Sequence, residues 1–478
     1  MPGIDLTSTC ILLCGWAAAM VVASILWARL ARMSAERFMV AGRRVPGSIG
    51  TLALLAAWTW ALSINAPAQA AYNFGVAGPI YFGVGGGLML IMLAPFAGRI
   101  RELSPLGHTL PEFIGRRHGP GARATILVIN TLSVGVLLLL NLSVVAYAFE
   151  TFTPLSYAQS VWIVAAIVVA YTSISGIGAS IVTNVIQIAV ITLAAALVVP
   201  AVVASAGGPA AFLAAMPSIG EKANPLSLTA FLKMGLPFLV MSGVSPFSYP
   251  DLWQLAWTLR EGEVRRAYTR AGLAYMPYGM VFGALGLMAL ATGVTPGQPD
   301  ASDIAPVMAR AYLSTGLQAA FLGLVLAAAC STCDTGLSAL AALFMNDVYR
   351  PLVRPGAGDR ETLLAGRLAM AMGASVVALL AMRKISLLDT VFFLGAAKGA
   401  MVFPLLSSLY WRRVSPAGFI AGIAGGMALG IGLYGILHDV TEYYRVISIP
   451  ASILMGAGLC VAVSRRGRAE FDFESLTG

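Results

Sequence analysis

Charged side chains are scarce in this sequence. Asp, Glu, Lys and Arg make up only 11% of its 478 residues, whereas 58% of the residues are hydrophobic. A soluble domain has no use for so large an apolar fraction. The composition therefore excludes a soluble globular protein and predicts an all-α integral membrane protein in a lipid bilayer.

Histidine and cysteine are also few, which argues against an enzyme. An intramembrane enzyme needs a nucleophile with a base or a metal cluster, but the three histidines, His108, His118 and His438, all lie in predicted loops. The five cysteines fall within apolar runs, so we expect no disulfides. Cys330 and Cys333 have C-x-x-C spacing, but they occupy one turn of a predicted membrane helix without further metal ligands nearby.

Thirteen apolar runs are long enough to cross a ~30 Å hydrocarbon core. They predict transmembrane helices over roughly 7–28, 47–74, 77–98, 124–149, 157–173, 179–205, 229–257, 267–294, 317–345, 362–382, 386–411, 415–437 and 447–464. The first run ends in arginines and lacks a basic leader and a small-residue cleavage site. We therefore expect a retained helix there and not a signal peptide.

Basic residues follow alternate spans. The loops after the first, third, seventh, ninth and eleventh spans are rich in arginine, and the loops between them carry few basic residues. The positive-inside rule then places the N-terminus outside and the C-terminus in the cytoplasm of a multi-pass protein of the cell (inner) membrane. This arrangement accounts for the net charge of +9 without a nucleic-acid partner.

Two of the apolar runs are interrupted by proline, at residues 65–68 and 243–246, five spans apart. A proline inside a helix frees the carbonyl four residues earlier, here those of Ser63 and Ser242. At bilayer depth such groups persist only where protein, water or an ion satisfies them. Paired breaks in the two halves of a chain indicate a solute and ion site near the midplane of a transporter.

The predicted topology makes the two halves inverted copies. We expect an extra helix and loop at 1–46, one repeat of five spans at 47–205, an external loop at 206–228, a second repeat at 229–412, and two extra helices with a short tail at 413–478. The chain is then a 5+5 inverted-repeat core with discontinuous second and seventh helices. Such a core favours alternating access over a channel.

The ninth span carries a polar segment in an otherwise apolar run. Ser331, Thr332 and Asp334 follow Ala328, and Ala328, Ser331 and Thr332 share one helix face by their i, i+3, i+4 spacing. Sodium binds hard oxygen ligands, which hydroxyls and a nearby carbonyl supply. Alternatively, the hydroxyls bond back to carbonyls of their own helix and only pack it against its neighbours.

Several motifs resemble the sodium/solute symporter family. They are Ser331-Thr332-x-Asp334 followed by Asp347-Val348-Tyr349, and the segments 36–43, 109–114, 171–187 and 253–254, so that the resemblance covers residues 36 to about 415. Within the family, Trp58-Thr59-Trp60-Ala61 and the segment 72–79 are most similar to urea-type members.

The resemblance implies a leucine-transporter-like core that takes up a small polar solute such as urea, an amino acid or a carboxylate together with sodium. One sodium ion would lie between the broken second span and the ninth. Matched to this sequence, its ligands are the carbonyls of Asn65, Ala68 and Ala328 and the hydroxyls of Ser331 and Thr332. A proton-coupled or sodium-independent transporter of the same fold is the alternative.

The solute would lie beside the same break. Its candidate contacts are Gln69 and Tyr72 on the second span, Phe247 and Tyr249 on the seventh, and Lys398 on the eleventh. Ordinary helix packing is the competing explanation for each aromatic residue.

Two departures from the family pattern concern charge. Asn184 stands where the family usually carries an aspartate, so a second sodium is less expected. Lys398 lies midway along the eleventh span, where a charge costs at least ~2.5–3.5 kcal/mol. It pairs with Asp334, binds an anionic group of the substrate, or replaces a cation and couples transport to protons. Asp334 and Lys398 are therefore the candidate coupling residues.

Overall fold

The computed structural model describes residues 3–383, 387–441, 443–466 and 470–476. Regular structure in this part of the chain is helical, apart from an isolated bridge between Val45 and Leu259. Eleven of the described helices are long and apolar enough to cross a membrane. They are α1 Leu6–Ala31, α5 Ala77–Leu103, α7 Pro120–Phe152, α8 Tyr157–Ser175, α9 Ile177–Ser205, α14 Val264–Thr292, α16 Thr315–Leu343, α17 Asp359–Ala381, α18 Leu387–Tyr410, α19 Pro416–Leu437 and α20 Tyr444–Ser464.

The all-α membrane prediction is confirmed by this architecture. Residue 386, where we expect the eleventh span to begin, lies outside the described residues. The π-helical turn η5, Phe344–Val353, extends α16 at its C-terminal end.

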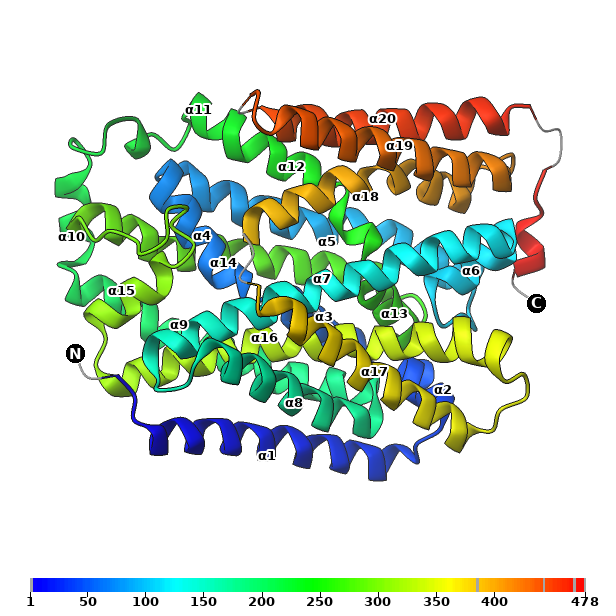
Figure 1. The fold of residues 1–478 in the computed structure, drawn as a ribbon, viewed down its shortest axis with the longest axis horizontal. Helices are drawn as coiled ribbons and strands as arrows, with labels where there is room; N and C mark the ends of the chain where they lie inside the picture. Colours follow the sequence, from blue (N-terminus) through cyan, green and yellow to red (C-terminus); the bar gives the residue numbers. More distant parts are fainter. Residues whose placement is uncertain (1–2, 384–386, 442, 467–469, 477–478) are drawn as a thin grey trace.

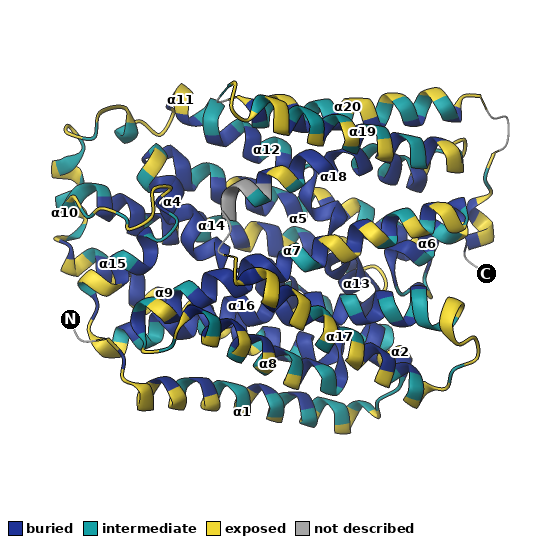
Figure 2. Cartoon of the chain, viewed as in Figure 1, coloured by how far each residue is buried: buried dark blue, intermediate teal, exposed yellow. Residues whose placement is uncertain are grey.

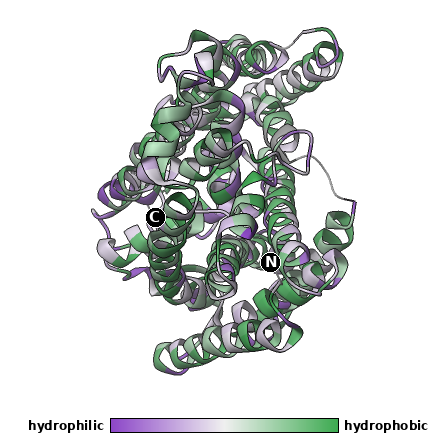
Figure 3. Cartoon of the chain, turned by 90° about the vertical axis from the view of Figure 1, so that its left-hand side faces the viewer, coloured by the Kyte–Doolittle hydropathy of each residue, from purple (hydrophilic) through white to green (hydrophobic). Residues whose placement is uncertain are grey.

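The helices lie side by side, with α1 along one edge of the bundle and α19 and α20 along the other (Figure 1). Buried residues concentrate on the central helices, above all α7 and α16 (Figure 2). Hydrophobic residues predominate along the helices and hydrophilic ones gather mainly in the loops (Figure 3). The chain termini lie toward opposite ends of the bundle (Figure 1).

One end of the bundle collects the arginine-rich loops, and we call it the basic end. It carries the short helices α2, Ala35–Val40, and α6, Leu110–His118. The loops touch one another there: Arg43 donates to the carbonyl of Gly107 (2.7 Å), and Arg117 to that of Arg412 (3.2 Å). The opposite end carries α10, Gly208–Ala215, the turn η2, Gly220–Ala223, and α15, Ile304–Tyr312.

The second predicted span is broken, but not where proline suggested. Helices α3, Gly47–Trp58, and α4, Leu62–Phe74, meet at an angle of 57°, and Pro67 lies inside α4. At the break, the N–H of Ala61 donates to Oδ1 of Asn141 on α7 (2.9 Å). The predicted position at residues 65–68 is therefore wrong, because a side chain from another helix supplies the partner for the interrupted backbone.

The seventh predicted span is broken where expected. It consists of α11 Leu228–Ala230, the π-helical turn η3 Phe231–Gly235, α12 Leu236–Ser242, the 3-10 turn η4 Ser245–Ser248 and α13 Pro250–Thr258. The interruption between α12 and α13 includes Gly243 and Pro246, which confirms the prediction. None of these pieces spans a membrane alone, so the count of thirteen spans stays a prediction.

Small residues bring α5 and α14 close together and fix the frame around the broken helices. A Cβ on Gly83 would lie 2.3 Å from the carbonyl oxygen of Met276, and one on Gly279 would lie 2.5 Å from the Cα of Gly83. Such close backbone approach is the usual packing device between membrane helices. Helix α14 in turn packs against α4.

Candidate functional site

Two hydroxyls of α16 face the end of α3. Ser331 Oγ donates to the carbonyls of Ala56 (2.9 Å) and Ala328 (3.0 Å). Thr332 Oγ1 donates to those of Ala57 (3.1 Å) and Ala328 (3.2 Å). Carbonyls in the last turn of a helix lack the usual partner four residues on, and that of Ala56 accepts the N–H of Thr59 at the helix cap (3.1 Å). Three carbonyl and two hydroxyl oxygens thus converge in the buried space between the two helices, a donor set that suits a hard cation.

Asn65 and Ala68 do not belong to this group of oxygens. Both lie in α4, beyond the break, and the carbonyl of Ala68 faces α14, where a Cβ on Gly286 would lie 1.9 Å from it. The carbonyls beside the hydroxyls of α16 are those of Ala56 and Ala57.

Asp334 lies one turn further along α16 and is fully buried. Its carboxylate accepts hydrogen bonds from four hydroxyls contributed by α8, α9 and α16. The donors are Tyr171 (2.9 Å), Ser180 (2.6 Å), Thr183 (2.9 Å) and Thr335 (3.1 Å). The ion pair with Asp334, one of the three alternatives for Lys398, is not formed in this structure, where hydroxyl groups occupy the carboxylate.

Asn184 faces the same cluster from α9. Its Nδ2 donates to Thr335 Oγ1 (3.1 Å), and its Oδ1 is buried without a hydrogen-bond partner among the described residues. Asn184 thus shares Thr335 with the carboxylate of Asp334 on the facing helix. The group of polar side chains around Asn184 therefore contains one carboxylate, which the identity of residue 184 alone does not reveal.

Lys398 on α18 has a different environment. Its side chain is buried, and within the described part of the chain its Nζ has no hydrogen-bond partner and no ion pair. The ammonium lies 4.3 Å from the ring centroid of Tyr249, a cation–π geometry. Asp251 on α13 is close enough to interact with it electrostatically. Because a contact with a ring face is not an ordinary hydrogen bond, the three N–H donors of Lys398 have no acceptor among the described residues.

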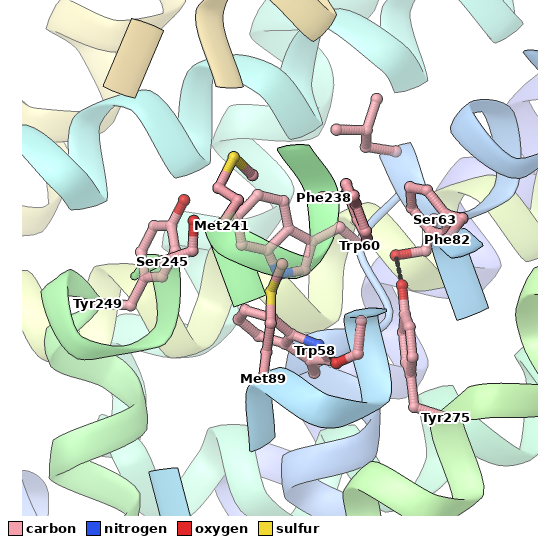
Figure 4. A pocket seen from close by; sticks show the side chains of 12 residues that line it. Trp58, Trp60, Ser63, Phe82, Met89, Phe238, Met241, Ser245, Tyr249 and Tyr275 are labelled. Carbon is pink, nitrogen blue, oxygen red and sulfur yellow. Dashed lines mark hydrogen bonds between the residues drawn. The ribbon is translucent and has the colours of Figure 1, made fainter. Parts of the chain in front are cut away.

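A cavity of about 60 Å³ lies where the two broken helices meet (Figure 4). Because a buried water needs roughly 10–15 Å³ of such volume, the cavity has room only for a few waters or a very small solute. Trp58, Trp60 and Tyr249 form one wall, with ring centroids 5.3–6.2 Å apart. Opposite them, Tyr275 donates to Ser63 Oγ (2.7 Å). The indole N–H of Trp60 is buried without a partner among the described residues.

Of the five predicted substrate contacts, only Tyr249 lines this cavity, and Lys398 lies over its ring. Phe247 packs against Phe96 and Trp253 instead. Trp58 and Trp60 belong to a motif that the sequence singled out, but no sequence signal pointed to Tyr275.

Gln69 and Tyr72 lie toward the far end of α4 and tie it to loops at the end of the bundle opposite the basic end. Gln69 Nε2 donates to the carbonyl of Asp300 (2.6 Å), and Lys222 Nζ donates to the carbonyl of Tyr72 (2.9 Å). These contacts hold the opposite end of the bundle closed around α4. They do not place either side chain in the cavity.

At the basic end, an ionic cluster holds the segment that leads into α3. Arg43 pairs with Glu36 (2.8 Å), and His108 lies between Glu36 at its Nε2 and Glu112 at its Nδ1. Burial acts to lower the pKa of His108, but hydrogen bonds and charges from Glu112 and Glu36 outweigh it and raise that pKa. Burial opposes ionisation of Glu36, yet His108 and Arg43 lower its pKa to about 2.

The basic-end halves of the two broken spans are joined to each other. Val45 N–H donates to the carbonyl of Thr258 (3.1 Å), and Arg260 N–H donates to the carbonyl of Val45 (3.0 Å). The start of α3 and the end of α13 are therefore connected by backbone, and the ionic cluster attaches both to the loop before α6.

A model of the sodium:solute symporter family matches residues 38–426. Curated relatives include the urea-proton symporter DUR3 of Oryza sativa subsp. japonica (25% identical, covering 86% of this chain and 62% of that protein), the probable urea active transporter 1 of Schizosaccharomyces pombe (24%, 70% and 54%) and the sodium/proline symporter of Haemophilus influenzae (26%, 73% and 73%). The chain thus spans less than two thirds of the length of the urea transporters.

Solved structures share the fold. A Na+-coupled sialic acid symporter in a substrate-bound outward-open state superposes with a TM-score of 0.79 at 15% identity, covering 96% of this chain and 98% of that one. Mhp1, a nucleobase-cation-symport-1 family transporter, gives 0.59 at 17% identity, covering 91% and 96%. These relatives and structures are transporters and not enzymes, and the fold is leucine-transporter-like, as the sequence motifs indicated.

Proposed function

The chain belongs to the sodium:solute symporter family, and we propose that it is a secondary active transporter that takes up a small polar solute together with a cation. The observation that carries this proposal is the cavity at the junction of two broken helices, with a group of oxygen ligands directly beside it. Broken helices that pair across two repeats suit alternating access around a central site. Residues 47–205 and 229–412 are the two inverted repeats in this proposal.

The basic end faces the cytoplasm in this proposal, with the N-terminus outside. The positive-inside rule supports this orientation. Closure of the opposite end by Gln69 and Lys222, and of the basic end by the cluster around His108, then corresponds to an occluded arrangement. Each end must release its contacts in turn for the solute to pass.

Sodium is the proposed coupling ion, bound by the hydroxyls of Ser331 and Thr332 and the carbonyls of Ala56, Ala57 and Ala328. Replacing both hydroxyls by alanine removes two ligands, each worth ~1–1.5 kcal/mol, so sodium-stimulated uptake into proteoliposomes should fall well over tenfold. Ser338→Ala is the matched control, because this buried hydroxyl of the same helix has no partner among the described residues. Equal uptake in sodium and potassium by the unmodified protein would rule sodium out.

Proton coupling is the second candidate, and the cluster around Asp334 favours it. Asp334 is a fully buried carboxylate, and because each hydroxyl around it can accept as well as donate, the cluster can reorient its hydrogen bonds when the carboxylate takes up a proton. One relative is named a urea-proton symporter. In this case a pH gradient drives uptake without sodium, and Asp334→Asn abolishes that component while Ser331→Ala leaves it.

The proposed solute is a planar amide of the size of urea. Urea is one of the smallest polar solutes, which suits a cavity of about 60 Å³, and its face can lie against a single ring of the aromatic wall, since Trp60 and Tyr249 are perpendicular to each other (87°). Ser63, Tyr275 and the free indole N–H of Trp60 supply polar partners. Proline, with twice as many heavy atoms, requires the cavity to open.

Competition with radiolabelled urea tests this assignment. Excess unlabelled urea and acetamide should suppress uptake, whereas proline and acetate should not. Trp60→Phe keeps an aromatic side chain, although a smaller one, and removes the indole N–H, so the KM for urea should rise about tenfold with little change in kcat. Preferential competition by proline would show that the solute is an amino acid.

A further inference from the structure

A hollow of about 340 Å³ opens on the surface of the basic end, between the first turns of α3 and α14. Its lining comes from both helices and from the loop before α14: Pro46, Gly47, Ser48, Arg260, Glu263, Arg266, Ala267 and Arg270. Neither the cavity between the broken helices nor the oxygen cluster on α16 includes any of these residues. The hollow is therefore a separate feature of the molecule.

Three guanidinium groups border the hollow and lack acidic partners. Among the described residues, Arg260, Arg266 and Arg270 form no ion pair, although the neighbouring Arg265 pairs with Glu102 (2.8 Å). Glu263 is the only acid in the lining, and its Oε2 accepts the N–H of Gly47. The hollow thus carries an excess of positive charge without a counterion from the protein.

The hollow also lies on a lipid-facing surface. Arg266, Arg270 and Leu273 follow one another at i, i+4 and i+7 and so share one face of α14, and Leu273 is exposed. On α3, Ile49 and Leu52 are exposed just beyond the first turn. Exposed apolar side chains on membrane helices meet acyl chains. The arginines that continue this face beyond the apolar residues therefore lie at the depth of the lipid headgroups.

We propose that this hollow binds the headgroup of an anionic phospholipid, with Arg260, Arg266 and Arg270 around its phosphate. Guanidinium groups suit phosphate oxygens because their fork of N–H donors makes bidentate hydrogen bonds. The acyl chains extend along Leu273 of α14 and Leu52 of α3. Basic pockets between membrane helices are a recognised mode of lipid headgroup binding. This site does not depend on which solute or cation the chain carries.

The test is lipid binding to the purified full-length chain in detergent. Native mass spectrometry counts the bound lipids, and a thermal-unfolding titration with dioleoyl phosphatidylglycerol gives the affinity. We expect one retained phosphatidylglycerol per chain and a higher unfolding temperature as this lipid is added. Dioleoyl phosphatidylcholine and inorganic phosphate at equal concentration should produce neither effect.

Substitutions locate the site. Arg270→Gln should weaken phosphatidylglycerol binding about fivefold, the increment expected for one basic residue at an anionic surface, and Arg266→Gln with Arg270→Gln about twentyfold or more. Arg29→Gln is the matched control, because Arg29 is an exposed arginine at the same end of the bundle but outside the hollow. Its binding should equal that of the unmodified protein.

Three results would overturn the proposal. The first is a folded, monodisperse double variant that binds phosphatidylglycerol as well as the unmodified protein does. The second is equal binding of phosphatidylcholine, which carries no net charge. The third is equal stabilisation by inorganic phosphate, which would make the hollow a site for free anions. Arg270 is exposed and has no ion pair among the described residues, so the single variant should fold even if the double variant does not.

Discussion

Asp334 and Lys398 are two buried charges in the same helical core, and their surroundings differ completely. Four hydroxyls donate to the carboxylate of Asp334, whereas the ammonium of Lys398 has an aromatic ring beneath it and no hydrogen-bond partner among the described residues. A buried charge is tolerated when its hydrogen bonds are complete. Asp334 is therefore a finished part of the structure, while Lys398 requires a ligand or water to complete its contacts.

The comparison also separates the two residues in function. With the ion pair excluded, Lys398 is left with the other two roles that the sequence allowed, a contact for the solute or a substitute for a cation. Its Nζ lies 4.3 Å from the ring centroid of Tyr249, which lines the cavity, and this position suits both roles. Asp334 is separated from the cavity lining and lies next to the ligands of the proposed sodium site on α16.

The largest expected effect is on stability and comes from Asp334. Asp334→Asn leaves several buried hydroxyls poorly paired and should lower the free energy of unfolding by about 3 kcal/mol. Lys398→Met removes an ammonium that has no hydrogen-bond partner among the described residues but also leaves the buried Asp251 without its nearby positive charge, so it should destabilise the protein less than Asp334→Asn does. Thermal unfolding of both variants in detergent measures the difference. Because the residues share no partner, the change in free energy of unfolding in the double variant should equal the sum of the two single changes within about 0.5 kcal/mol. A double variant more stable than the sum of the single variants predicts would show instead that Asp334 and Lys398 do form an ion pair.

The next effect is on uptake and comes from Lys398. Lys398→Met should fold normally but lower the initial rate of uptake into proteoliposomes tenfold or more, because methionine supplies neither the positive charge nor the N–H donors of the lysine. Lys398→Arg keeps the charge and serves as the control, with a smaller loss. Unchanged uptake by Lys398→Met would mean that this residue contacts water alone and takes no part in transport.

A smaller effect should follow when a single donor to Asp334 is removed. Tyr171→Phe deletes one of the four hydroxyls and should reduce the free energy of unfolding by about 1 kcal/mol, because three donors remain. The same change at Tyr278, a partly buried tyrosine whose hydroxyl meets Thr192, is the matched control and should cost less. A loss as large as that of Asp334→Asn would show that the hydroxyls are not interchangeable.

The smallest effect concerns a third charge, His108, whose two ring nitrogens both face carboxylates outside the membrane-spanning segments. Glu112 and Glu36 raise its pKa, so its contribution to stability is complete below the unfolded value of ~6.5 and is lost as the pH rises through the higher folded pKa. Because Glu36 is half exposed, we expect about 1 kcal/mol or less. His108→Asn should abolish this pH dependence in thermal unfolding between pH 6 and pH 9, and a variant that keeps it would contradict the assignment.

The sequence located the helices but misplaced one break, for a physical reason. Pro67 is a visible interruption of a helix, yet it lies inside α4, while the actual break is stabilised by Asn141 from α7. An ion pair between Asp334 and Lys398 was reasonable from two isolated charges. The pair does not form, because hydroxyls of α8 and α9 bind the carboxylate. Nothing in the sequence marks these residues as its partners.

The amino-acid sequence by itself determined that this chain is a helical membrane protein, that its seventh span is broken near Pro246, and that Ser331 and Thr332 share a polar face with Ala328. These properties depend on composition and on contacts within one helix, which the order of residues specifies. Only the tertiary structure decided that Ala56 and Ala57 meet those hydroxyls, that Tyr275 closes the cavity, and that Lys398 lies over Tyr249. Each of these contacts joins helices that are distant in sequence, and packing against other helices sets where they meet.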